Sequence, residues 1–172
     1  MSACNVEVIK RVGRYYNVSV GTVCFNTDKV LTTVINKQSI EGFATIVLKL
    51  ASLSGLQLSQ EERLLSYQWL EHIAMYANQA AANPVFALGF LKDINKALEK
   101  TTYLTGQKLN VTDVAAYYVL YPLIERLSVS ERESFMHVCR WIKHIQAQPK
   151  ICTSQPLPLN TLNLTILAPA VH

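Results

Sequence analysis

Two histidines and a cysteine near the C-terminal end of the chain have the side-chain types that bind transition metals, because imidazole and thiolate groups are common ligands. His137, Cys139 and His144 lie close together in the sequence. In a helix, however, the two histidines share one face and the cysteine points elsewhere. The three side chains do not converge, so we predict no metal site and no cofactor.

The cysteines also indicate the compartment. The chain holds four cysteines, which are far apart and form no Cys-x-x-Cys motif. Charged residues from Glu7 to Arg14 occupy the region where a secretory signal would need an apolar run. We therefore expect a cytosolic protein whose thiols are not paired in disulfides.

Basic side chains are scattered along the chain, with 16 Lys+Arg against 12 Asp+Glu and a net charge of +4. The densest cluster is Lys10, Arg11 and Arg14. Nucleic-acid binding through counterion release requires basic groups gathered on one face. A charge run this short is typical of a solvated helix face, so we predict no direct contact with nucleic acid.

The composition excludes a disordered chain, because 50% of the residues are hydrophobic and only 16% are charged. It also predicts no membrane span: the apolar run Ile46-Val47-Leu48 is interrupted by Lys49, and a spanning helix needs about 20 apolar residues. Such a low charge content favours apolar surface patches that a partner protein covers.

The first part of the chain alternates between helical and strand patterns. Residues 6–16 have a helical pattern, and 18–25 and 30–35 are β-rich. A helix is expected over 39–53, with Ser39 as its N-cap. Phe43, Ile46 and Leu50 form a second apolar face on that helix, which must meet either a second domain or another chain.

Helical patterns dominate after a short linker at 54–59. Ser59 and Glu62, Asn110 and Asp113, and Ser130 and Glu133 have the spacing of capping boxes. The last of these predicts a helix whose polar face carries Glu133, His137, Arg140 and His144. The segment from 151 to 171 has no charged side chain. We predict that it is an extended tail that lies on its own domain or on a partner. We thus expect domains at 1–53 and 60–150 and a tail at 151–172.

A Tyr-Leu-x-Gly turn at 103–106, the capping box at 110–113 and a tyrosine-rich helix resemble the C-terminal half of the glutathione-transferase fold. The resemblance extends from about 6 to 150 and is strongest from 67 to 146. In detail, the chain is similar to non-enzymatic auxiliary subunits of the multi-aminoacyl-tRNA synthetase complex. The segments that carry this narrower likeness are 39–46, 68–71, 91–93, 116–118 and 140–146.

The resemblance implies an α+β fold, with a reduced thioredoxin-like N-terminal half and an all-α C-terminal helical domain. An active transferase also needs an activating hydroxyl or thiol by its first strand and a cis-proline turn. Here the first strand is missing, and no proline precedes Pro84. Gln38 and Ser39 resemble the pair that binds the γ-glutamyl group, but one half-site is weak support. Cys4, Tyr15 and Tyr16 have no nearby base, so we predict no catalytic residue.

The resemblance further implies a scaffold that binds glutathione-transferase-like domains of methionyl-tRNA synthetase and glutamyl-prolyl-tRNA synthetase, with elongation factor 1 subunits as further partners. One contact would use Phe43, Ile46, Leu50 and Glu71. The other would use the last helix, where Arg140 matches the anchoring arginine of the family and can form a bidentate pair with a carboxylate. Glu133, His137 and His144 would flank it. Cytoplasmic and some nuclear residence is also implied.

Two alternatives remain at this point. The chain could be a glutathione-dependent transferase with residual activity, or a homodimeric module of translation elongation factor 1. Turnover of a chlorodinitrobenzene substrate tests the first, and the mass measured by light scattering tests the second.

Overall fold

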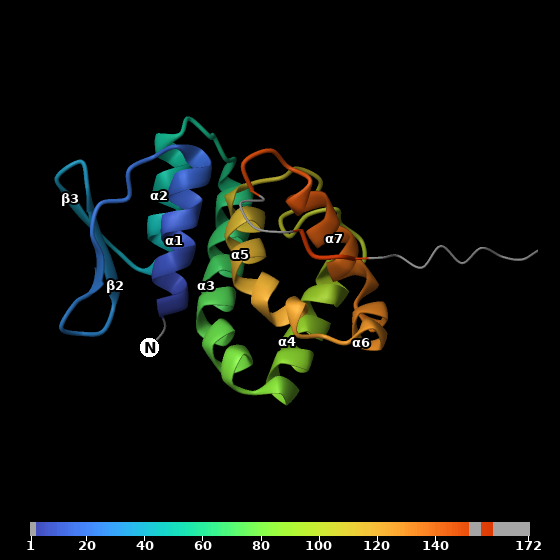
Figure 1. The fold of residues 1–172 in the computed structure, drawn as a ribbon. Coiled ribbons are helices and arrows are strands. Elements are labelled where there is room, and N and C mark those ends of the chain that lie inside the picture. The colour runs from blue at the N-terminus through green and yellow to red at the C-terminus, as the bar shows by residue number, and fades with distance from the viewer. Residues whose placement is uncertain (1–2, 152–155, 160–172) are drawn as a thin grey trace, which may run out of the picture.

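The computed structural model describes residues 3–151 and 156–159, which form a small sheet and two groups of helices (Figure 1). The N-terminal elements are α1 (Ala3–Tyr16), β1 (Val23–Phe25), β2 (Leu31–Ile35), β3 (Gln38–Glu41) and α2 (Phe43–Leu53). Helices follow: α3 (Gln60–Ala82), α4 (Pro84–Ala97), α5 (Val111–Glu125), α6 (Val129–Ser134) and α7 (Met136–Gln146). The fold is α+β, as predicted.

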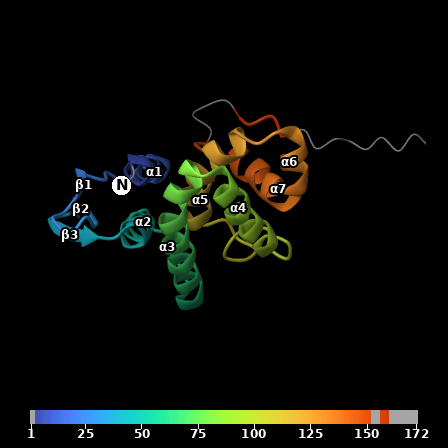
Figure 2. The same cartoon turned by 90° about the horizontal axis from the view of Figure 1, so that it is seen from below.

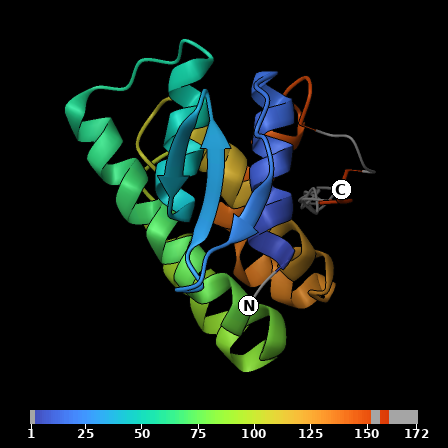
Figure 3. The same ribbon diagram turned by 90° about the vertical axis from the view of Figure 1, so that its left-hand side faces the viewer.

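The sheet is antiparallel and has the order β1-β2-β3. Helices α1 and α2 lie on one of its faces, between the sheet and the remaining helices (Figures 2 and 3). Leu31 and Ile35 point from β2 into this core and are 5% and 4% exposed, whereas Val34 on the opposite face is 57% exposed. The alternation is that of a sheet covered on one side only.

The prediction that Ser39 caps a helix over 39–53 is wrong at its start. Asn36 and Lys37 have φ angles of 51° and 66°, as a tight hairpin turn requires, and this turn brings residues 38–41 back onto β2 as strand β3. Helix α2 begins at Phe43, after Gly42 with φ 87°. Such an angle strains any side chain that has a Cβ, which explains glycine at this junction.

The strand predicted over 18–25 is also shorter than expected. Only Val23–Phe25 pairs with β2. The segment before it is held by Thr33, a buried residue whose hydroxyl donates to the carbonyl oxygens of Val20 at 2.7 Å and Thr22 at 3.1 Å. A side chain thus supplies the hydrogen bonds that a neighbouring strand would otherwise provide.

Helix α2 is buried on two sides, as its sequence indicates, but both sides meet the same chain. It packs against α1, α3, α5 and the sheet. Phe43 is 5% exposed, and Ile46 and Leu50 are completely buried. The second apolar face is therefore covered by other elements of this chain, without a second chain.

Capping boxes define the starts of the helices in the C-terminal half. The boxes at Ser59 and Asn110 are confirmed, with both reciprocal hydrogen bonds present. The predicted box at Ser130 and Glu133 is wrong by two residues, because Ser128 and Glu131 form it instead. The helix it starts ends at Ser134, and α7 begins only at Met136. Glu133 therefore belongs to a different helix from Arg140.

The described portion of the tail lies on the helical half. Ile151 and Leu157 are 1% and 5% exposed. Gln146 on α7 donates through Nε2 to the Leu157 carbonyl oxygen at 3.2 Å and accepts from the Leu157 N–H at 3.2 Å. The predicted extended tail thus contacts its own domain here, while the rest of that prediction, over 152–155 and 160–172, lies outside the described residues.

Candidate docking surfaces

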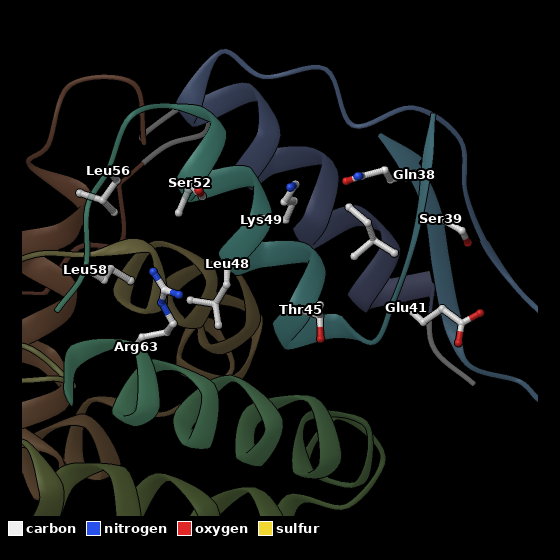
Figure 4. Close-up of a pocket in the computed structure, with 12 residues that line it drawn as sticks. Gln38, Ser39, Glu41, Thr45, Leu48, Lys49, Ser52, Leu56, Leu58 and Arg63 are labelled. Atoms are coloured by element: carbon white, nitrogen blue, oxygen red, sulfur yellow. The ribbon is translucent and has the colours of Figure 1, made fainter. Parts of the chain in front are cut away.

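A groove of about 700 Å³ lies on the outer side of α2. Strand β3 borders it at one end, and the linker and the start of α3 border it at the other (Figure 4). Leu48, Leu56 and Leu58 provide its apolar lining, and Lys49 and Arg63 carry positive charges beside them. Apolar contacts framed by charged groups are typical of protein-binding surfaces. We call this the α2–α3 groove.

The predicted residues Phe43, Ile46 and Leu50 do not line this groove, which is a correction to the predicted contact surface. All three are buried inside the chain. Leu48 and Lys49 on the same helix are partly exposed and line the groove. The sequence pattern selected a side of α2 that packs on the protein itself, and the α2–α3 groove lies on another side of the same helix.

Glu71 lies on α3 and is partly buried. Tyr67 and Met75, one helical turn before and after it, are 45% and 63% exposed, and Leu64 is 61% exposed. Residues at this spacing share one face of a helix. Sequence reasoning missed this apolar strip. The sequence did contain a signal for this strip, because α3 has more large apolar side chains than its buried face holds.

The second surface lies on α7, where His137, Arg140 and His144 share a face through their spacing. Arg140 and His144 are exposed, and His137 is partly buried. Glu133 is exposed on the neighbouring α6. We call His137, Arg140 and His144 the α7 surface, and Glu133 lies outside it.

Arg140 also has a role within the chain. Its Nη2 donates to the carbonyl oxygens of Leu98 at 2.6 Å and Thr101 at 3.0 Å. Leu98 is the C-cap of α4, where carbonyl groups lack helical partners and favour a positive charge. The guanidinium is thereby held in one orientation by one of its two terminal nitrogens, so it does not have to be ordered when a carboxylate binds.

The start of α7 is capped from another helix. Phe135 is its N-cap residue and offers no capping side chain. Asn95 on α4 takes over this role, because its Oδ1 accepts from the N–H groups of His137 at 3.0 Å and Val138 at 3.1 Å. The cap fixes the end of α7 that carries His137 against α4.

The buried side chain of Asp113 also fixes the position of α7. Its Oδ1 accepts from the Trp141 Nε1 at 2.9 Å and from the Leu104 N–H at 3.0 Å, and its Oδ2 accepts from the Asn110 N–H at 3.2 Å. Burial raises the pKa of Asp113 to about 6, although these three hydrogen bonds act in the opposite direction. The carboxylate joins α5, the turn before it and α7, and so it positions the helix that carries Arg140.

The N-terminal half does not assemble the features of a peptide site. Gln38 and Ser39 lie on β3, three or more residues before α2 begins. Burial raises the pKa values of Tyr15 and Tyr16, and the charges of Tyr15 and Asp113 add to the shift at Tyr16. A raised pKa keeps these phenols protonated. Within the described residues there is no cis peptide bond, and the side chain of Cys4 lies outside them.

No group of three or more His, Cys, Asp or Glu residues in the described ranges is arranged to hold a metal ion. Among the helices of those ranges, none combines the length and the apolar character needed to cross a membrane.

Comparisons with known proteins identify relatives. A family model described as nuclear-export cofactor Arc1p matches residues 63–149. Eukaryotic translation elongation factor 1 epsilon-1 of Homo sapiens is 35% identical over 121 residues, which are 67% of this chain and 68% of that protein. The protein of the same name from Cricetulus griseus is 36% identical over the same coverage.

A structural neighbour supports the fold. The glutathione-bound theta class glutathione S-transferase of Xanthomonas axonopodis pv. citri has a TM-score of 0.64 and 16% identity, over 86% of this chain and 88% of that one. At this identity the likeness establishes the fold alone.

Proposed function

This chain belongs to the family of eukaryotic translation elongation factor 1 epsilon-1, and from that premise we propose that it is a non-catalytic scaffold subunit of the multi-aminoacyl-tRNA synthetase complex. Its α2–α3 groove binds the glutathione-transferase-like domain of methionyl-tRNA synthetase. Its α7 surface binds that of glutamyl-prolyl-tRNA synthetase, and elongation factor 1 subunits are further candidate partners. The family description as a nuclear-export cofactor supports a cytoplasmic protein that also enters the nucleus.

The observation that carries this proposal is the separation of the two surfaces. Helix α2 lies on one side of the molecule and α7 on the other, with α3 and α5 between them (Figures 1 and 2). A body with two docking surfaces on different sides can hold two partners at the same time. A scaffold needs this arrangement, whereas a catalyst with a single active site does not.

The non-catalytic part of the proposal rests on the transferase features described above. The chain has no proline before Pro84, so a cis-proline turn cannot form in the sheet. Tyr15 and Tyr16 at the end of α1 have raised pKa values, whereas stabilising a thiolate requires an acidic donor. We expect no turnover of chlorodinitrobenzene with glutathione above the uncatalysed rate. Measurable turnover would favour the alternative of a residual transferase.

The α7 contact is tested by Arg140→Ala, with Lys143→Ala as control because Lys143 is exposed on the same helix. Pull-down of the glutamyl-prolyl-tRNA synthetase domain at physiological salt should fall at least about tenfold for Arg140→Ala, since losing a charge-assisted contact costs about 1.5–3 kcal/mol. The Lys143→Ala variant should bind normally. Unchanged binding of Arg140→Ala would show that the assignment is wrong.

The groove contact is tested by Leu48→Asp, which replaces part of the apolar lining with a negative charge beside Lys49 and Arg63. The control is Leu53→Asp, because Leu53 is on the same helix, 38% exposed and outside the groove. Binding of the methionyl-tRNA synthetase domain should be lost only in the first variant. Light scattering of the protein alone should give a monomer, and a stable homodimer would favour the elongation factor 1 module instead.

A further inference from the structure

Strand β3 is the last strand of the sheet, and only one of its edges is paired. The order β1-β2-β3 leaves its other edge without a neighbouring strand in the described part of the chain. That edge borders the α2–α3 groove, where Gln38, Ser39 and Glu41 stand at one end (Figure 4). An open edge presents backbone groups on which another strand can pair.

The register identifies which backbone groups face outward. The Gly42 N–H donates to the Leu31 carbonyl oxygen at 2.8 Å, and Ile40 pairs with Thr33 in the same register. In an antiparallel pair, the backbone N–H and C=O groups of successive residues alternate: those of one residue bond to the partner strand, and those of the next point away from it. Gly42 and Ile40 therefore bond to β2, and the N–H and C=O groups of Ser39 and Glu41 point outward. No turn, loop or cap of the described residues uses them.

A partner that covers the groove would remove water from these groups. A buried backbone donor or acceptor without a hydrogen-bond partner is destabilising. A helix uses its own backbone groups internally and offers none along its side, whereas an extended segment presents donors and acceptors at the spacing of β3. The edge therefore favours a partner segment in the extended conformation.

The residues that line the groove also indicate which types of side chain that segment carries. Leu48, Leu56 and Leu58 form an apolar lining next to the edge. Lys49 and Arg63 give this part of the groove two positive charges, against the single carboxylate of Glu41 on the strand. Charge complementarity therefore favours an apolar side chain that lies over the leucines and a neighbouring carboxylate that faces Lys49 or Arg63.

We propose that the α2–α3 groove binds an extended, acidic-apolar segment of the partner, which adds to the sheet as a fourth strand along the outer edge of β3. This inference rests on the proposed function, because it describes how the synthetase domain docks at this surface. The strand pairs with the N–H and C=O groups of Ser39 and Glu41. Its apolar side chain lies on the leucines of the groove.

The primary test is amide hydrogen exchange at single-residue resolution, on the full chain alone and with the methionyl-tRNA synthetase domain. The amides of Ser39 and Glu41 should exchange at least about tenfold more slowly in the complex, because each becomes hydrogen-bonded. If the complex forms while both amides keep their original exchange rates, strand addition is wrong although the docking surface stands. If no complex forms, the proposed function itself fails.

A matched pair of variants supplies the second test. Ser39→Pro removes an outward N–H and leaves the ladder to β2 intact, as proline at an edge strand allows, whereas Ser39→Ala removes only the side chain. The dissociation constant should rise about tenfold or more for Ser39→Pro and stay within about twofold for Ser39→Ala. Equal affinities for the two variants would overturn strand addition. If Ser39→Pro does not fold, the exchange rates of the unmodified protein decide.

Discussion

Asp113 joins three parts of the helical half, because its two oxygens accept from the Leu104, Asn110 and Trp141 donors. Asp113→Asn keeps one acceptor oxygen but turns an NH2 group toward a buried N–H. We expect the free energy of unfolding in urea to fall by about 2–3 kcal/mol. Asp93→Asn, at an exposed position of α4, is the control and should be neutral. Equal stability of the two variants would contradict this role.

The same carboxyl group predicts a pH dependence. Burial raises the pKa of Asp113 from 3.8 to about 6, so the folded state binds its proton more tightly than the unfolded chain does. The resulting stabilisation, about 2–3 kcal/mol, is complete below pH 3.8 and is lost as the pH rises through 6. The stability difference between the unmodified protein and Asp113→Asn should therefore be larger at pH 5 than at pH 7. Parallel pH profiles would contradict the raised pKa.

Individual residues were predictable from sequence only where their partners are close along the chain. The box of Asn110 and Asp113 could be read directly because three positions separate its members. The bond from Asp113 to Trp141 and those from Arg140 to Leu98 and Thr101 join residues 28 to 42 positions apart. No local pattern encodes such contacts, since they depend on how the helices pack.

At the scale of elements, the cap that Asn95 provides to α7 is the sharpest test of how the α7 surface is built. Asn95→Ala leaves the N–H groups of His137 and Val138 without their acceptor. Losing a cap costs about 1 kcal/mol of stability, and amide exchange at these two residues should accelerate. Lys96→Ala on the same helix is the control. Unchanged exchange at His137 and Val138 would show that the cap does not hold this end of α7.

The elements were predictable to different degrees for physical reasons. Ser128 and Ser130 are each followed three positions later by a glutamate, so the sequence alone offers two capping boxes, and packing selects the first. Strand β3 was missed because the turn at Asn36 and Lys37 contains no glycine, although both residues adopt positive φ angles. The division at 54–59 between two domains stays a prediction.

For the whole molecule, α2 shows why apolar sequence patterns locate interfaces only in part. Two apolar faces correctly indicated a helix covered on two sides, but the pattern cannot tell a second domain from a second chain. Phe43, Ile46 and Leu50 are buried within the chain, on a helix that packs against α1, α3, α5 and the sheet. The α2–α3 groove is lined instead by the mixed strip around Leu48 and Lys49, where apolar and charged groups alternate and no simple periodicity stands out.

The separation of the α2–α3 groove from the α7 surface predicts that the two partners bind independently. Charges on opposite sides of α3 and α5 interact weakly, because the Debye length at physiological ionic strength is about 8 Å. A first ligand changes the affinity for a second only through differential interactions with two states of the protein. Calorimetric titration of the glutamyl-prolyl-tRNA synthetase domain, with and without saturating methionyl-tRNA synthetase domain, should give dissociation constants within about twofold. A change of tenfold or more in either direction would show that the body between the surfaces has two conformations, and mutual exclusion would show that the surfaces overlap.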